Sequence, residues 1–225
     1  MNKFFKKIMV LFILPVISLS SCGQKGSEIT KEEAKNIAYS IREHNEQMTD
    51  EELASSYEYK LYSKQSMSSS GDKTYETKLI VRKQDDKFYY EQKTNIADKE
   101  DVSIIYFYSK DGDYYQYDAV KETEIKIQEG LEQFYLETIN TLSYSALLRK
   151  HTSDLLARIE ESGMEFYSKG EGSLILESSL KGPNITIGYY IEFEDYLLRK
   201  CEITDQYRTI SLSIRYGKIS VKIPN

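Results

Sequence analysis

Residues 185–194 read Ile-Thr-Ile-Gly-Tyr-Tyr-Ile-Glu-Phe-Glu, with an apolar side chain at every second position. A period of two places the apolar and the polar side chains on opposite faces of a β-strand. Residues 210–216 and 219–223 repeat the same alternation. The C-terminal part therefore predicts antiparallel strands in a sheet with one apolar face and one face open to water.

The same period extends upstream of this stretch. Turn-forming residues such as Asp111-Gly112 separate runs rich in Tyr, Ile and Val, which is typical of antiparallel hairpins. The sequence predicts further strands over residues 57–67, 74–82, 88–94, 103–109, 114–119, 165–168 and 173–180. Together with the C-terminal runs, these make a sheet of about 10–11 strands.

Two regions have helical periodicity instead. Thr30-Lys31-Glu32-Glu33 has the form of a capping box, and an apolar stripe continues from Ala34 to Ile41. The narrow stripe predicts a helix that lies on a surface. A second region, residues 127–159, predicts two or three short helices, with a fresh N-cap at Thr152-Ser153-Asp154 and a helix end at Gly163.

Length and composition limit the classes of protein and of partner to consider. The chain has 225 residues, of which 40% are hydrophobic, so it can bury a core and is not a disordered protein. It has 30 basic and 36 acidic residues and a net charge of −6. Nucleic acid is therefore not an expected partner, since binding to phosphates requires clustered Lys and Arg.

The first 21 residues predict a leader that is removed. Three lysines precede an apolar run from Ile8 to Leu19, and this run is too short to span a membrane as a helix. It ends in Leu19-Ser20-Ser21-Cys22, which resembles the lipobox of bacterial lipoproteins. The resemblance implies cleavage between Ser21 and Cys22 and a diacylglycerol or palmitate-type lipid on Cys22. The alternative is an ordinary secretory signal with a chance cysteine.

This leader predicts the domain organisation and the location. Residues 1–21 are a lipoprotein signal peptide, residues 22–29 a lipidated N-terminus and tether, and residues 30–225 a single domain. The lipid on Cys22 would hold the protein on the extracytoplasmic face of the cell membrane, or on an outer membrane if the cell has one. Because the leader contributes three lysines and no acidic residue, the mature body is more acidic still. We expect the lipid alone, and no basic patch, to provide the anchor.

The order of elements resembles a known group. A helix, about five strands, a helical segment and a second run of strands follow the lipobox, as in the half-barrel fold of the LolA and LppX/LprG-like lipoproteins. The resemblance implies an α+β fold: a strongly curved antiparallel half-barrel sheet with helices packed on its concave face. It also implies that lipids or lipoproteins bind in an apolar cavity between sheet and helices. No motif allows ligand-binding residues to be transferred, so these remain unknown.

Residues suited to catalysis or metal binding do not form a recognisable motif. His44 and His151 lack a second ligand at suitable spacing and are expected at the surface, so neither a metal nor another cofactor is predicted. The acidic pairs, such as Glu32-Glu33 and Glu160-Glu161, occur where helix starts and solvated faces place them. Cys201 shares the apolar parity of its segment and is expected to be buried; the alternatives are a nucleophile or an intermolecular disulfide.

The twenty tyrosines are the most unusual feature of the composition, and many occur as close pairs or triplets. Cross-strand packing explains them most simply. A contact surface for another envelope protein is the alternative. The sequence thus predicts a lipid-anchored, non-enzymatic binding or carrier protein for an apolar ligand, with a Tyr-rich interaction module as the second hypothesis. The clusters are Tyr57/Tyr59/Tyr62, Tyr89/Tyr90, Tyr106/Tyr108, Tyr114/Tyr115/Tyr117 and Tyr189/Tyr190.

Overall fold

The computed structural model describes residues 25–48, 56–66, 74–96, 99–128, 130–131, 133, 144–181 and 186–224. Within these ranges the chain forms one antiparallel sheet of twelve strands and two helices, α1 (Lys31–Gln47) and α4 (Tyr144–Ile159). The α+β class and the antiparallel sheet agree with the prediction. The strands are β1 (Ser27–Glu28), β2 (Ser56–Ser66), β3 (Thr74–Gln84), β4 (Lys87–Ile96), β5 (Lys99–Lys110), β6 (Asp113–Asp118), β7 (Thr123–Lys126), β8 (Glu165–Ser168), β9 (Leu174–Lys181), β10 (Thr186–Glu194), β11 (Leu197–Thr204) and β12 (Arg208–Tyr216).

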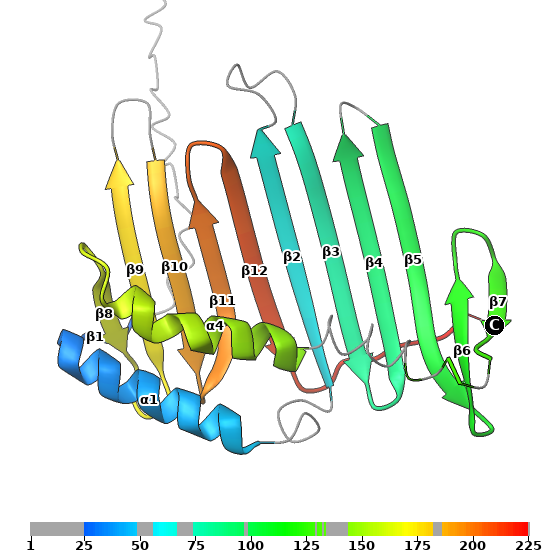
Figure 1. Ribbon diagram of the computed structural model, residues 1–225, viewed down its shortest axis with the longest axis horizontal. Helices are drawn as coiled ribbons and strands as arrows, with labels where there is room; N and C mark the ends of the chain where they lie inside the picture. Colours follow the sequence, from blue (N-terminus) through cyan, green and yellow to red (C-terminus); the bar gives the residue numbers. More distant parts are fainter. Residues whose placement is uncertain are drawn as a thin grey trace, which may run out of the picture.

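The sheet consists of two meanders joined side by side. Its order is β1-β8-β9-β10-β11-β12-β2-β3-β4-β5-β6-β7, so β2 to β7 form one meander and β8 to β12 the other. The seam between them is the pairing of β12 with β2, which extends from Arg208↔Gln65 to Tyr216↔Tyr57. The sheet is open, with β1 and β7 as its edge strands (Figure 1).

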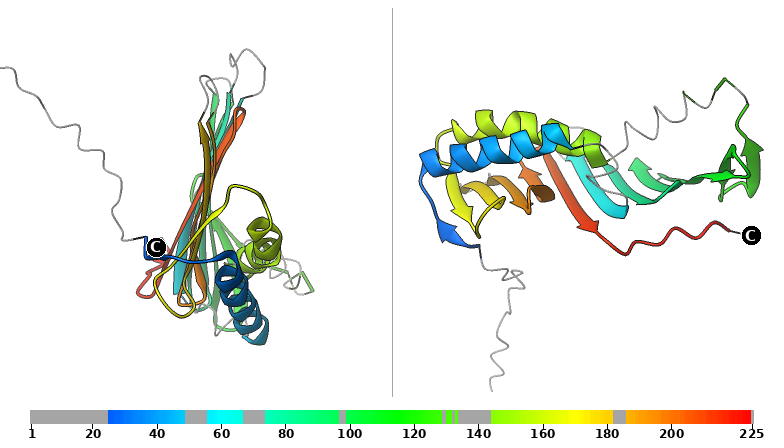
Figure 2. Two further views of the ribbon diagram at one scale, coloured as in Figure 1. Left: turned by 90° about the vertical axis from the view of Figure 1, so that its left-hand side faces the viewer. Right: turned by 90° about the horizontal axis from the view of Figure 1, so that it is seen from below.

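Both helices lie on the same side of this sheet (Figure 2). We call that side the inner face and the opposite side the outer face. The helices pack against each other, α1 contacts β8 and β9, and α4 contacts β11. They therefore cover the half of the inner face that β8 to β12 form, and leave the β3 to β6 half beyond their ends (Figure 1).

The core lies between the helices and the inner face. Leu148, Leu155 and Ile159 of α4 are buried in one cluster with apolar side chains from β9 to β12 and from β2 to β4. The helix α1 contributes the stripe that the sequence predicts, and its capping box is formed: Thr30 Oγ1 accepts from the Glu33 amide, and the Glu33 carboxylate accepts from the Thr30 amide at 2.8 Å. Burial of this cluster is the main source of stability for the fold.

The outer face is polar and has its own ordered charge network. Glu58 of β2 is buried and lies between Arg82 of β3 and Arg215 of β12. Arg82 Nε donates to Glu58 Oε2 at 2.5 Å, and Arg215 Nε donates to Oε1 at 3.1 Å. Burial raises the pKa of Glu58, but the hydrogen bonds from the two arginines outweigh it and hold that pKa below its ordinary value. The network ties the two meanders together across the seam.

Two predicted elements differ from the structure. Residues 219–223 do not form a strand; instead Val221 is buried at the strand ends, and its amide donates to Gln84 Oε1 at 2.9 Å. The helix α4 runs without interruption through Thr152, because the Thr152 hydroxyl donates to the Leu148 carbonyl inside the helix instead of capping a new one. Gly163 lies past the helix end, in the turn before β8.

Other differences are matters of extent. The sheet has twelve strands, where about 10–11 were expected: β1, β7 and β11 were not among the predicted ranges, whereas residues 219–223 were predicted as a strand and do not form one. The predicted helical stripe over residues 131–142 falls largely outside the described residues. None of the helices in the described part of the chain has the length and apolar character that crossing a membrane requires.

Candidate functional site

The inner face continues as an apolar surface beyond the helices. A row of directly paired residues crosses the sheet from Ile214 of β12 through Tyr59, Val81 and Tyr90 to Ile105 of β5. Ile214, Tyr59 and Val81 are buried, whereas Tyr90 and Ile105 are half-buried. Because paired residues point to the same face of a sheet, this row is one continuous apolar strip that emerges from beneath the helix pair.

A second row runs parallel to the first. Lys83 of β3 pairs with Phe88, Phe88 pairs with Phe107 of β5, and Phe107 pairs with Gln116 of β6. Phe88 is buried and Phe107 is half-buried, and their ring centroids are 6.2 Å apart. The two rows end in polar residues at β6, where Asp118 pairs with Ile105. Leu79 lies two residues before Val81 on the same face and is also half-buried. We call Leu79 and the half-buried residues of the two rows, Tyr90, Ile105 and Phe107, the apolar strip.

The part of the inner face beneath the helices is closely packed with buried side chains, unlike the half-buried apolar strip. Leu174, Leu176, Ile191, Phe193 and Leu198 are each fully buried in the same cluster as α4. Protein interiors of this kind are close-packed, so a ligand could enter only by displacing side chains. Of the apolar inner face in the described residues, the apolar strip is a part in which the side chains are only half-buried.

A groove of about 460 Å³ lies between the two helices. Its described lining comes from the C-terminal half of α1 and the middle of α4. The ends of the helices nearest this groove point toward the β3 to β6 half of the sheet (Figure 1). The described lining residues are Arg42, Asn45, Glu46, Arg149, Thr152 and Ser153.

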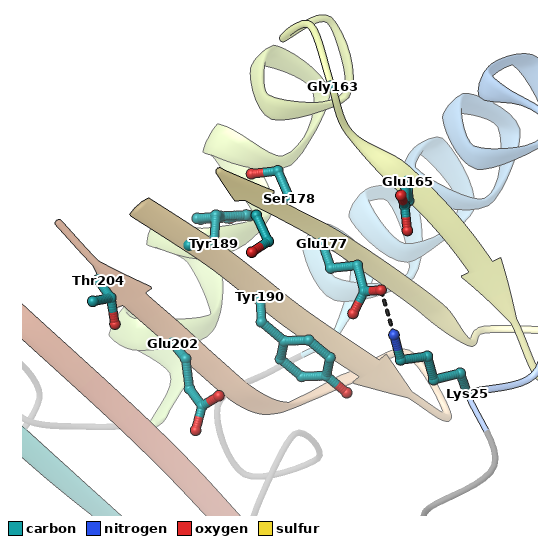
Figure 3. A pocket seen from close by; sticks show the side chains of 11 residues that line it. Lys25, Gly163, Glu165, Glu177, Ser178, Tyr189, Tyr190, Glu202 and Thr204 are labelled. Atoms are coloured by element: carbon teal, nitrogen blue, oxygen red, sulfur yellow. Dashed lines mark hydrogen bonds and ion pairs between the residues drawn. The ribbon is translucent and has the colours of Figure 1, made fainter. Parts of the chain in front are cut away.

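A hollow of about 360 Å³ lies where β8 stops short of the ends of β9 and β10 (Figure 3). Gly188 leaves space in β10 there, and acidic side chains surround the space, among them Glu177 and Glu202. Lys25 forms an ion pair with Glu177, and its Nζ lies 5.3 Å from the centre of the Tyr167 ring. Lys25 is three residues after Cys22, so this contact positions the start of the described chain against the sheet.

The predicted lipidation and cleavage residues, Cys22 and Ser21, lie outside the described residues. Cys201, in contrast, is placed by the structure: it is 2% exposed on the inner face, as the alternation predicts. Burial raises the pKa of its thiol to about 11. The thiol therefore stays protonated at neutral pH and is a poor nucleophile.

The two histidines lie on separate helices. His44 of α1 stacks on Tyr196 with ring centroids 4.3 Å apart, and His151 of α4 is half-buried, so neither is as exposed as the sequence suggests. Burial lowers the pKa of His151. Among the described residues, no three His, Cys, Asp or Glu side chains converge as metal ligands would. Asp111 and Gly112 form the tight turn between β5 and β6 that the sequence predicts, with φ of 55° and 85°.

The tyrosine clusters divide between the two faces of the sheet. Tyr57, Tyr59, Tyr90 and Tyr189 lie on the inner face, while the neighbouring Tyr89 and Tyr190 lie on the outer face. On the outer face, Tyr89 packs on Tyr106 at 5.0 Å, Tyr106 on Tyr117 at 6.1 Å and Tyr108 on Tyr115 at 5.7 Å. Several hydroxyls donate to a carboxylate two residues along the same strand, as Tyr89 does to Glu91 and Tyr190 to Glu192. These contacts are the cross-strand packing that the sequence favours.

Sequence reasoning missed two residues that the structure brings together. Asn45 is 3% exposed and Thr152 is 5% exposed, and both line the groove between the helices. The signal was present: Asn45 follows Ile41 by four residues, and Thr152 follows Leu148 by four, so each continues an apolar stripe with a polar side chain. A polar residue at a core position of a helix marks either a satisfied structural contact or a site.

Comparison with known proteins gives a structural similarity alone. No family model matches the sequence, and no curated protein matches it. Among solved structures, the fold is similar to the crystal structure of LprF from Mycobacterium bovis, with a TM-score of 0.36 and 10% sequence identity. The similarity covers 89% of this chain and 99% of that chain, and it concerns the arrangement of strands and helices only.

Proposed function

We propose that this chain is a lipid-anchored extracytoplasmic binding or carrier protein, and that it holds an acyl chain or a similar apolar ligand on the apolar strip. The observation that carries the proposal is the half-buried part of the inner face, where Leu79, Tyr90, Ile105 and Phe107 continue the core beyond the helix pair. Binding there needs no catalytic residue, since burial of apolar surface supplies the free energy.

The expected energy is sufficient for binding. Each buried methylene group contributes about 0.8 kcal/mol, so a chain of ten methylene groups gains about 8 kcal/mol before the entropy of association is subtracted. The polar ends of the two rows at Gln116 and Asp118 would limit the length of chain that the strip accepts. The leader supports an extracytoplasmic location, where a lipid on Cys22 would keep the protein beside a membrane that contains such ligands.

A matched pair of variants tests the proposal. Ile104 and Ile105 are adjacent in β5, both half-buried, and point to opposite faces of the sheet. In the chain from Gly23 onward, Ile105→Glu should reduce uptake of a fluorescent fatty acid at least tenfold, because the charge lies in the strip. Ile104→Glu should leave uptake unchanged, because it alters only the outer face.

Thermal unfolding of both variants checks that the fold is retained. Native mass spectrometry of the unaltered protein should show a co-purified lipid. Equal uptake by the two variants, or no lipid and no uptake in the unaltered protein, would contradict the proposal.

A further inference from the structure

The two faces of the strands β3 and β4 differ in charge as well as in hydrophobicity. On the outer face, Lys78 pairs with Glu76 at 3.3 Å and Lys93 pairs with Glu91 at 3.1 Å. The inner-face residues between them are uncharged, although they lie beyond the ends of the helices (Figure 1). A sheet face that meets only water normally carries charged side chains, so this inner face is suited to contact with an uncharged group. The inner-face residues are Thr77, Leu79, Gln92 and Thr94.

The uncharged polar residues of the inner face adjoin the apolar strip directly. Gln92 of β4 pairs with Leu79 of the strip on one side and with Ser103 of β5 on the other. Gln92 lies two residues after Tyr90, and Ser103 lies two residues before Ile105, so this pair forms the next row on the same face. Successive rows on one face of a sheet are about 7 Å apart. One side of the apolar strip is therefore bordered by side chains that form hydrogen bonds.

Gln92 is held in one orientation by contacts along its own strand. The Tyr90 hydroxyl donates to Gln92 Oε1, and Gln92 Nε2 donates to Thr94 Oγ1 at 3.0 Å. The two bonds together determine which end of the amide is the oxygen. An amide nitrogen has two hydrogens, so the bond to Thr94 leaves one N–H of Gln92 for a ligand. Gln92 and Ser103 are both half-buried, so an accessible N–H and an accessible hydroxyl lie side by side at the border of the strip.

The charged residues nearest to this pair on the inner face are acidic. Asp101 lies on β5 two residues before Ser103, and Asp118 of β6 pairs with Ile105 of the strip. The lysines on the inner face of β3 and β5, Lys83 and Lys99, lie two rows away in opposite directions. A phosphate or carboxylate here would thus lie closer to acidic than to basic side chains, and binding of an anion without a cationic partner is unfavourable.

We infer that the ligand of the apolar strip is a lipid with an uncharged head that bears hydroxyl groups, and that this head lies on Gln92 and Ser103. The inference rests on the function proposed above. Acylglycerols are the simplest lipids with this chemistry: the ester carbonyl accepts from Gln92 Nε2, and a glycerol hydroxyl bonds to the Ser103 hydroxyl. A fatty acid has the same chain and also occupies the strip, but it binds more weakly because its carboxylate lies near Asp101 and Asp118.

Three probes with one palmitoyl chain and different heads test the inference in the chain from Gly23 onward. They are 1-monopalmitoylglycerol, its 3-phosphate, and methyl palmitate, which lacks the hydroxyls. Each is used below its critical micelle concentration to displace a bound fluorescent fatty acid. Monopalmitoylglycerol should act at about fivefold lower concentration than methyl palmitate, because of its hydrogen bonds. It should act at about tenfold lower concentration than the phosphate, because of the missing cation.

Variants on neighbouring residues identify the site of the head. Gln92→Leu should remove the preference for monopalmitoylglycerol over methyl palmitate. Ser103→Lys should make the phosphate the tightest of the three probes, because it supplies a cation beside the strip. Val102→Lys is the matched control: Val102 pairs with Lys93 on the outer face, so the same charge there should leave the order of the probes unchanged. Thermal unfolding checks that each variant is folded.

The probes distinguish the failure of this inference from the failure of the proposed function. Methyl palmitate reports on the strip alone, so a protein that no probe and no fatty acid binds would contradict the proposed function and this inference together. Equal potency of the three probes, or tighter binding of the phosphate to the unaltered protein, would overturn only the inference about the head. The same conclusion would follow if Ser103→Lys and Val102→Lys ranked the probes alike.

Discussion

Single residues determine where the backbone of this fold is strained, and Gly172 shows it most directly. Its φ is 65°, and a Cβ at this position would lie 2.7 Å from the Tyr196 ring. Gly172 therefore permits both the left-handed turn and the close approach of Tyr196, whose backbone carbonyl accepts a hydrogen bond from Asn45 Nδ2.

Gly172→Ala should consequently lower the free energy of unfolding by about 2 kcal/mol, from the left-handed strain and the collision together. Gly112→Ala is the matched control, because Gly112 also has a positive φ, of 85°, but has nothing within 4 Å of the added carbon. Urea denaturation measures both. Equal losses would show that the contact with Tyr196 does not matter.

The ionised Glu58 carboxylate should make the free energy of unfolding depend on pH in the acidic range. Because its pKa in the folded state is below the ordinary value of 4.5, the network contributes stability above that pH and loses it as the pH falls through the folded pKa. Glu58→Gln should cost about 1–3 kcal/mol at pH 7, and much less near pH 3. The measurement is chemical denaturation at the two pH values. A loss that is independent of pH would mean that the two arginines do not depend on this charge.

At the scale of elements, the strands β4 to β6 show what the tyrosines do. Tyr115 and Tyr117 lie on the outer face of β6 and pack on Tyr108 and Tyr106, whereas Tyr114 lies on the other face and is 37% exposed. These contacts give each of the two outer tyrosines a structural role that Tyr114 lacks.

Tyr115→Ser and Tyr117→Ser should each lower the free energy of unfolding by about 1–2 kcal/mol, because each removes an aromatic cross-strand pair. Tyr114→Ser should change it by less than about 0.5 kcal/mol. Thermal unfolding distinguishes these variants. If the outer variants keep full stability but lose an envelope partner in a pull-down, the interaction-module hypothesis would replace the structural one.

The accuracy of sequence reasoning also differs between elements. The strands β2 to β6, β9, β10 and β12 have apolar alternation that is decided by burial of one face, and so they were predictable, whereas β11 was not among the predicted strands. The short strand β7 has every residue exposed, so only its pairing with β6 defines it. Residues 219–223 alternate like a strand, yet they end as an irregular segment, because Gln84 and Ser56 bond to them through side chains and no strand pairs with them. Alternation predicts burial of one face; it does not predict a hydrogen-bonding neighbour.

At the scale of the whole molecule, the seam between β12 and β2 joins two meanders. Within each meander, strands pair with their neighbours in sequence, whereas the seam pairs strands that are far apart in the chain. A chain that ends at Tyr207 would lack β12 and leave Glu58 without Arg215. It would also remove the buried side chains of Leu212 and Ile214 from the core. We expect such a chain to lose cooperative unfolding altogether, whereas a chain that ends at Lys218 should still unfold cooperatively at a lower temperature. Circular dichroism during heating checks this. Cooperative unfolding of the shorter chain would show that the two meanders are independent domains.

The groove, in contrast to the sheet, could not have been assigned from sequence. Asn45 and Thr152 are more than a hundred residues apart, and only the packing of α1 on α4 brings them to one hollow. The apolar strip could not be assigned from sequence either. Alternation predicts which side chains share a face, but not which part of that face lies beyond the helices.

The pairing of β12 with β2 can form only late in the biogenesis of the protein, because β2 is made long before β12. A polypeptide that crosses a membrane from its N-terminus delivers β2 early, and its neighbour β12 arrives more than a hundred residues later. Until then β2 has an unsatisfied edge of eleven residues, one of the longest in the molecule. Such an edge invites mispairing with other nascent chains, and contacts between distant residues form slowly. Under the export that we propose, folding of this protein should therefore depend on a holding chaperone on the far side of the membrane until β12 has crossed.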